Sequence, residues 1–110
     1  MMVNDHDRDM EIVQSALLDK GSDRCRIAEV GLEMISLLIQ KNEDYGSSVW
    51  KRPILAPSMN TCDAILVRMS DKVSRIANLS TNEAKVASES MEDTLRDLVG
   101  YGILYMAAPR

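Results

Sequence analysis

The sequence has no phenylalanine, and it has only one tryptophan and three tyrosines among 110 residues. Eight methionines, together with leucine, isoleucine and valine, must therefore supply the core, and unbranched aliphatic side chains suit helices better than sheets. No stretch approaches the ~20 consecutive apolar residues of a membrane-spanning helix, and the acidic N-terminal segment has no apolar signal core. We therefore expect a cytoplasmic protein with no membrane partner.

Cysteine, histidine and basic charge are also scarce. Cys25 and Cys62 are far apart, and the only histidine, His6, lies in a polar segment. Zinc binding and a disulfide framework are therefore not expected. The net charge of −4 argues against a broad basic surface for nucleic acid. The length predicts one domain over residues 1–110, and self-association is a usual way for so short a chain to bury more surface.

Hydrophobic periodicity predicts an all-α fold, a compact four-helix bundle. The expected helices cover residues of about 7–19, 23–43, 60–79 and 83–106, with a long loop over residues 44–59 that contains Pro53 and Pro57. The second helix is apolar around most of its circumference, which favours a central position or a subunit interface, and hence a homodimer or higher homo-oligomer. The fourth carries an apolar stripe: Met91, Leu95, Leu98, Val99, Ile103 and Met106.

Helix termini can be read from the same sequence. Gly21 ends the first helix, and Ser22 or Asp23 can cap the second. Asn60 can cap the third helix with Asp63, three positions later, as its reciprocal partner.

The third helix has a charged arc beside its apolar face. Arg68, Lys72 and Arg75 lie within about 100° of one another, together with Asp71. In one interpretation the basic side chains bind phosphates and Asp71 contributes to a metal site. In the other, Asp71 forms ordinary intrahelical ion pairs with Arg68 and Arg75, each worth a few tenths of a kcal/mol.

Two carboxylates lie one turn apart on the fourth helix. Glu89 and Asp93 repel each other unless a cation lies between them, so with Asp71 they are candidate ligands of Mg²⁺, which prefers oxygen. A solvated acidic face, moderated by Arg96, is the alternative.

The end of the second helix holds further candidates, Lys41, Asp44 and Tyr45. They could reach a nucleotide from the loop, or they could simply terminate the helix, with Gly46 as its C-cap and Lys41 complementing the helix dipole.

Three ordered segments resemble a family that is common in phages, the nucleotide-modification-associated domain. They are KNEDYGS at residues 41–47, RMSDKVSR at 68–75 and ESMEDTLRDL at 89–98, and the resemblance extends from about Leu37 to Tyr105. More distantly, Glu89 and the run Asp93-Thr94-Leu95 are similar to the second acidic motif of the MazG-type all-α nucleoside triphosphate pyrophosphohydrolases.

The resemblance implies a MazG-like helical protein, usually oligomeric, that binds nucleotide phosphates through Mg²⁺, with water attacking between the α- and β-phosphates. If a phage encodes it, the protein acts in the host cytoplasm. The first motif of the enzymes supplies several glutamates, whereas here Asp71 is the only acid of the charged arc. We therefore favour binding of a nucleotide or a nucleotide-derived small molecule over hydrolysis as the function. We assign no catalytic residue.

Two alternatives remain open from the sequence. One is a non-catalytic phage protein that sequesters a nucleotide immune signal, an anti-defence binder. The other is a purely structural or partner-binding helical module.

Overall fold

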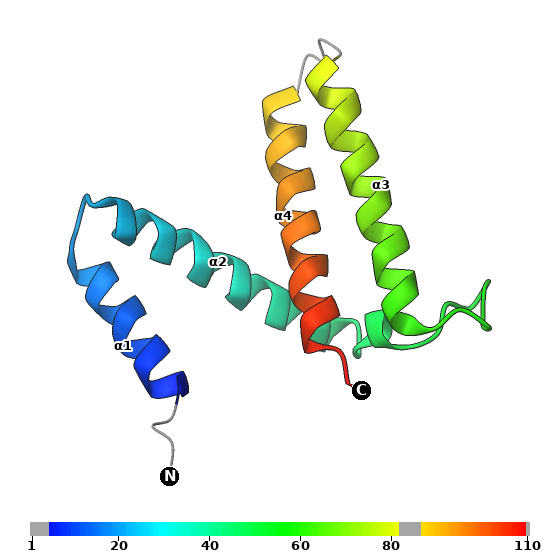
Figure 1. The fold of residues 1–110 in the computed structure, drawn as a ribbon, viewed down its shortest axis with the longest axis horizontal. Coiled ribbons are helices and arrows are strands. Elements are labelled where there is room, and N and C mark those ends of the chain that lie inside the picture. The colour runs from blue at the N-terminus through cyan, green and yellow to red at the C-terminus, as the bar shows by residue number, and fades with distance from the viewer. Residues whose placement is uncertain (1–4, 82–86, 110) are drawn as a thin grey trace. The chain divides into compact units, whose positions relative to one another are not determined.

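The computed structural model describes residues 5–81 and 87–109, and the side chains of residues 87–90 lie outside that description. The described part contains four α-helices and no strand: α1 (Asp5–Leu18), α2 (Asp23–Asp44), α3 (Thr61–Thr81) and α4 (Ala87–Ala107) (Figure 1). A short 3₁₀ helix, η1 (Ser48–Trp50), lies in the predicted loop. The all-α fold class is confirmed. None of the described helices combines the length and apolarity needed to cross a membrane.

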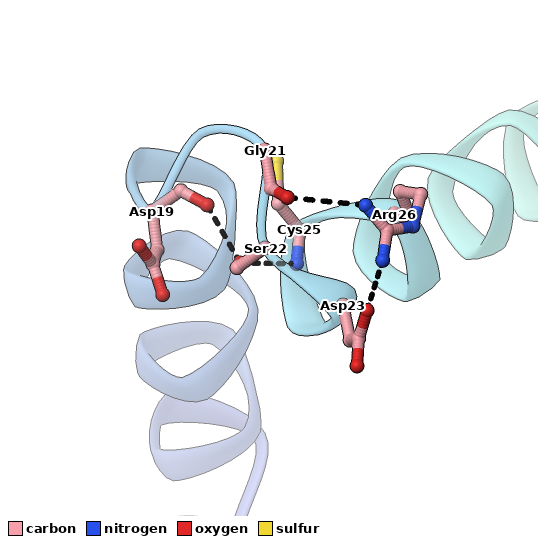
Figure 2. A network of polar contacts seen from close by, with 6 residues as sticks. All are labelled: Asp19, Gly21, Ser22, Asp23, Cys25 and Arg26. Atoms are coloured by element: carbon pink, nitrogen blue, oxygen red, sulfur yellow. Dashed lines mark hydrogen bonds and ion pairs between the residues drawn. The ribbon is translucent and has the colours of Figure 1, made fainter.

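Contacts divide the chain into two compact units, Met1–Ile39 and Gln40–Arg110. In the first unit, a tight turn joins α1 to α2 (Figure 2). Gly21 adopts a φ of 82°, which glycine tolerates without strain. The Ser22 hydroxyl donates to the Asp19 carbonyl oxygen at 2.6 Å and accepts the Cys25 N–H at 3.1 Å. Ser22 is therefore the N-cap of α2.

Small side chains are buried near the turn that joins α1 to α2. Ala16, Cys25 and Ala28 are buried. The Cys25 thiol lies 3.6 Å from two acceptors, the Leu17 carbonyl oxygen and Glu29 Oε1. Small side chains allow two helices to approach closely but bury little apolar area, and pieces of about 40 residues rarely hold together on such a core alone.

The C-terminus of α2 is a Schellman motif around Gly46. The Ser47 N–H donates to the Asn42 carbonyl oxygen at 3.0 Å, and the Gly46 N–H donates to that of Glu43 at 3.1 Å. Gly46 has a φ of 59°, as the motif requires. Gly46 is thus confirmed as the C-cap. Ser47, also at a φ of 59°, accepts a hydrogen bond from Asn42 Nδ2 at 3.1 Å and leads directly into η1.

In the second unit, α3 and α4 lie side by side and run in opposite directions (Figure 1). Ile65 of α3 is completely buried, and Thr94 of α4 is 3% exposed. The Trp50 indole N–H donates to the Leu104 carbonyl oxygen at 3.0 Å, which fixes η1 to the last turns of α4. This contact gives the predicted loop a defined anchor.

Part of the predicted apolar stripe of α4 is not packed. Leu95, Val99 and Met106 are exposed, whereas Thr94 and Tyr101 lie on the side that contacts α3. The reason is that α4 has apolar residues on two sides, and periodicity alone does not select the side that meets a neighbour.

Replacing Asn60 with alanine is expected to lower the free energy of unfolding by about 1 kcal/mol. Asn60 Oδ1 accepts the Asp63 N–H at 2.8 Å, so Asn60 caps α3 as predicted, and the return contact from Asn60 Nδ2 to Asp63 Oδ2 at 2.9 Å uses the side-chain amide instead of the backbone N–H. Urea denaturation followed by circular dichroism measures the change. Ser58→Ala, a substitution of an exposed residue before the cap, is the control. Equal stability of the two variants would contradict the capping role.

Candidate functional site

Polar side chains from α3 and α4 line one edge of the contact between these helices. Two contacts fix their register: Lys72 Nζ lies 3.1 Å from Asp97 Oδ2, and the Arg68 guanidinium carbon lies 6.0 Å from the centre of the Tyr101 ring. Arg68 and Lys72 are four residues apart on α3, and their partners Tyr101 and Asp97 are four residues apart on α4 in the reverse order, as expected for antiparallel helices. We call this edge the α3–α4 row, and it comprises Arg68, Asp71, Lys72, Arg75, Asp93, Asp97 and Tyr101.

The ion pair between Lys72 and Asp97 lies at the centre of the row. The Lys72 side chain is 28% exposed and that of Asp97 is 48% exposed, so solvent screens the pair, which contributes no more than about 1 kcal/mol. The pair still neutralises Lys72 and reduces its attraction for an anion. The sequence placed Lys72 among the phosphate ligands but did not identify Asp97 as its partner.

The Arg68 guanidinium lies over an aromatic ring at one end of the row. The distance to Tyr101 is that of a cation–π contact. A guanidinium in such a contact uses none of its N–H donors on the ring edge and keeps them available for an anion. Tyr101 was not predicted, although it follows Asp93 and Asp97 at the i, i+4, i+8 spacing that aligns side chains along one face of a helix.

Arg75 and Asp93 lie one turn further along, on the opposite side of the ion pair from Arg68. The antiparallel register places them at the same level, and both are exposed. Among the residues that the structure describes, no ion pair joins them, and Asp71 forms neither of the intrahelical pairs considered from the sequence, with Arg68 or with Arg75. The Arg75 guanidinium and the carboxylates of Asp71 and Asp93 therefore face solvent, where a ligand can reach them.

The predicted metal ligands are described only in part. Glu89 lies in α4, but its side chain is outside the described residues. Within residues 5–81 and 91–109, no group of three or more acidic, histidine or cysteine side chains is placed to hold a metal ion. Asp71 and Asp93 supply carboxylate oxygens, which suit Mg²⁺. The metal site stays a prediction.

Lys41, Asp44 and Tyr45 lie at the C-terminus of α2 with exposed side chains. The Tyr45 N–H donates to the Lys41 carbonyl oxygen at 3.0 Å, and the Tyr45 carbonyl oxygen accepts the Ser48 N–H at 3.2 Å. In the described part of the chain, no hydrogen bond or ion pair connects these three side chains to the α3–α4 row. They form a separate group, next to the Schellman motif.

The comparison with known protein families gives a match that includes the residues of the candidate site. A model described as nucleotide modification associated domain 1 matches residues 41–108, which is more than half of the chain. The chain belongs to this family. No curated protein and no solved structure matches the chain significantly. Every site residue predicted from the sequence falls within the part that matches nucleotide modification associated domain 1.

Proposed function

We propose that this nucleotide modification associated domain binds the phosphates of a nucleotide, or of a nucleotide-derived small molecule, along the α3–α4 row. The observation that carries the proposal is the family match over residues 41–108, because it includes the whole row. Arg75 is the first phosphate ligand in this proposal, since no ion pair with a described residue occupies it. Arg68 is the second, and Lys72 contributes less because Asp97 holds it.

The acidic side chains have a complementary role. Mg²⁺ is usually bound by one or two carboxylates together with substrate phosphates, and it keeps several water ligands. Asp71 and Asp93 fit this requirement, and we propose Glu89 as a further ligand. The cation would offset the repulsion between the carboxylates and the bound phosphates. Lys41, Asp44 and Tyr45 remain proposed nucleotide contacts at the end of α2.

Two outcomes for the bound nucleotide are proposed. The first is MazG-like, Mg²⁺-dependent hydrolysis of a nucleoside triphosphate to a monophosphate and pyrophosphate. The second is sequestration without catalysis, in a phage protein that removes a nucleotide immune signal. The composition of the row favours the second. Asp71 is the only acid that α3 contributes to the row, and Asp97 is engaged by Lys72, so few carboxylates remain to hold a metal and also act as general base.

Replacing Arg75 with alanine is expected to weaken nucleotide binding by about 10- to 100-fold, the loss that follows from removing a hydrogen bond to a charged group. Isothermal titration calorimetry with a panel of nucleoside triphosphates, with and without Mg²⁺, measures this effect. Arg8→Ala is the matched control, because Arg8 is exposed on α1 and lies outside the family match. Binding that is equal in the two variants would contradict the proposed role of Arg75.

Analysis of the nucleotide after incubation distinguishes the two outcomes. Release of pyrophosphate that depends on Mg²⁺ and is lost in Asp93→Asn supports hydrolysis. Recovery of the intact ligand after denaturation of the protein supports sequestration. Absence of binding across common and modified nucleotides would contradict both.

A further inference from the structure

Helix α2 exposes apolar side chains on two sides: Leu32, Ile35 and Ile39 lie on the side of Ala28, and a second group lies on the opposite side. Cys25 and Ala28, close to the turn that joins α1 to α2, are buried. Ile27 and Val30 point to another side and are 74% and 54% exposed, and Leu37 is also exposed. The residues of this second face follow the i, i+3, i+7, i+10 spacing of one helical stripe. We call them the α2 stripe: Ile27, Val30, Met34 and Leu37.

Gly31 lies inside the continuous helix α2, next to the α2 stripe. Glycine inside a helix costs about 1 kcal/mol relative to alanine. A Cβ atom built at Gly31 would meet no other atom within 4 Å, so no contact within the described chain requires glycine here. Gly31 stands on the flank of the stripe, about 80° from its centre at 100° per residue.

The α2 stripe is symmetric about residue 32. Ile27 and Leu37 lie five positions on either side of it, and Val30 and Met34 lie two positions on either side. At the two ends, nine positions from the centre, stand Asp23 and Lys41, which have opposite charges. The Asp23 side chain is 91% exposed even though it pairs with Arg26. An antiparallel copy of the same helix would therefore place apolar residues against apolar residues and Asp23 against Lys41.

We propose that the α2 stripe is the interface with a second copy of this chain, packed antiparallel around a two-fold axis that crosses the stripe between Val30 and Met34, at the level of residue 32. Such an interface is isologous, since each residue of one copy meets its symmetric counterpart on the other. The interface covers an apolar face left open in a first unit whose own core consists of small residues. It does not depend on nucleotide binding.

Sedimentation equilibrium of the full chain, over a wide range of concentrations and without nucleotide, tests the proposal. The wild-type chain is expected to have the mass of a dimer, and Val30→Asp the mass of a monomer with unchanged helix content. Val73→Asp is the matched control, because Val73 is a 55% exposed valine on α3, outside the stripe, and this variant is expected to remain dimeric. A monomeric wild-type chain, or equal effects of the two substitutions, would overturn the proposal.

Charge reversal tests the antiparallel orientation without changing the apolar face. Asp23→Lys alone and Lys41→Asp alone are each expected to weaken self-association about fivefold, and the double variant is expected to recover most of the loss. In a parallel arrangement position 23 of one copy would meet position 23 of the other, and position 41 would meet position 41. Like charges would then meet in the wild type, in the single variants and in the double variant. Single reversals that leave self-association unchanged would therefore contradict the two-fold axis at the level of residue 32.

Discussion

Replacing Ile65 with alanine is expected to lower the free energy of unfolding by about 3 kcal/mol. Ile65 has no exposed surface, and it is the largest side chain in the described chain that is fully buried. Alanine would leave a cavity in the contact between α3 and α4, where the helices themselves prevent collapse. A small domain has a total stability of about 5 to 15 kcal/mol, so this single change removes a large share of it.

Chemical denaturation of the Ile65→Ala variant, followed by circular dichroism, measures the loss. Ile65→Val removes one methylene group and should cost about 1 kcal/mol. Val67→Ala, at a half-exposed position on the same helix, should cost less than Ile65→Ala by a wide margin. A loss at Ile65 no larger than the loss at Val67 would show that Ile65 is not the centre of this core.

Replacing Trp50 with alanine is expected to lower the free energy of unfolding by about 2 to 3 kcal/mol, less than for a fully buried tryptophan because the ring is only partly covered. The variant loses the packing of the indole. It also leaves the Leu104 carbonyl oxygen without its donor, a further cost for a partly buried acceptor. We expect η1 to separate from α4 before the helices themselves unfold.

Trp50→Phe separates the two contributions, because it keeps a ring but removes the N–H donor, and it should cost about 1 kcal/mol from the hydrogen bond alone. Tyr45→Ala, which removes an aromatic side chain that is 68% exposed, should have little effect on stability. Thermal denaturation compares the three variants. A Trp50→Ala variant as stable as Tyr45→Ala would contradict the anchoring role of the indole.

Features that depend on neighbouring residues in the sequence were predictable. Asn60 and Asp63 are three positions apart, and their hydrogen bonds form the predicted cap of α3. Gly46 follows the last turn of α2 and has the φ that a C-cap requires. The four helices follow from 3.6-residue periodicity, which needs no knowledge of the tertiary structure.

Features that depend on how helices meet were not predictable. The sequence shows that α4 is apolar on more than one side, but only packing on α3 places Thr94 in the interior. The pairing of Lys72 with Asp97 requires the antiparallel register of α3 and α4, which cannot be deduced from the spacing of residues within one helix. The same register adds Tyr101 to the candidate site. It also gives the two basic residues different roles, because Asp97 neutralises Lys72 whereas Arg75 stays accessible to a ligand.

The burial of Cys25 between α1 and α2 makes it a natural chemical reporter. It is 2% exposed, and residues 1–39 contain no other cysteine. Alkylation of this thiol requires local opening around it, so its rate under native conditions measures the opening free energy of the junction between α1 and α2. The half-buried Cys62, at the start of α3, gives an internal comparison in the same molecule. The two thiols thus let one labelling experiment compare the local stability of the two units.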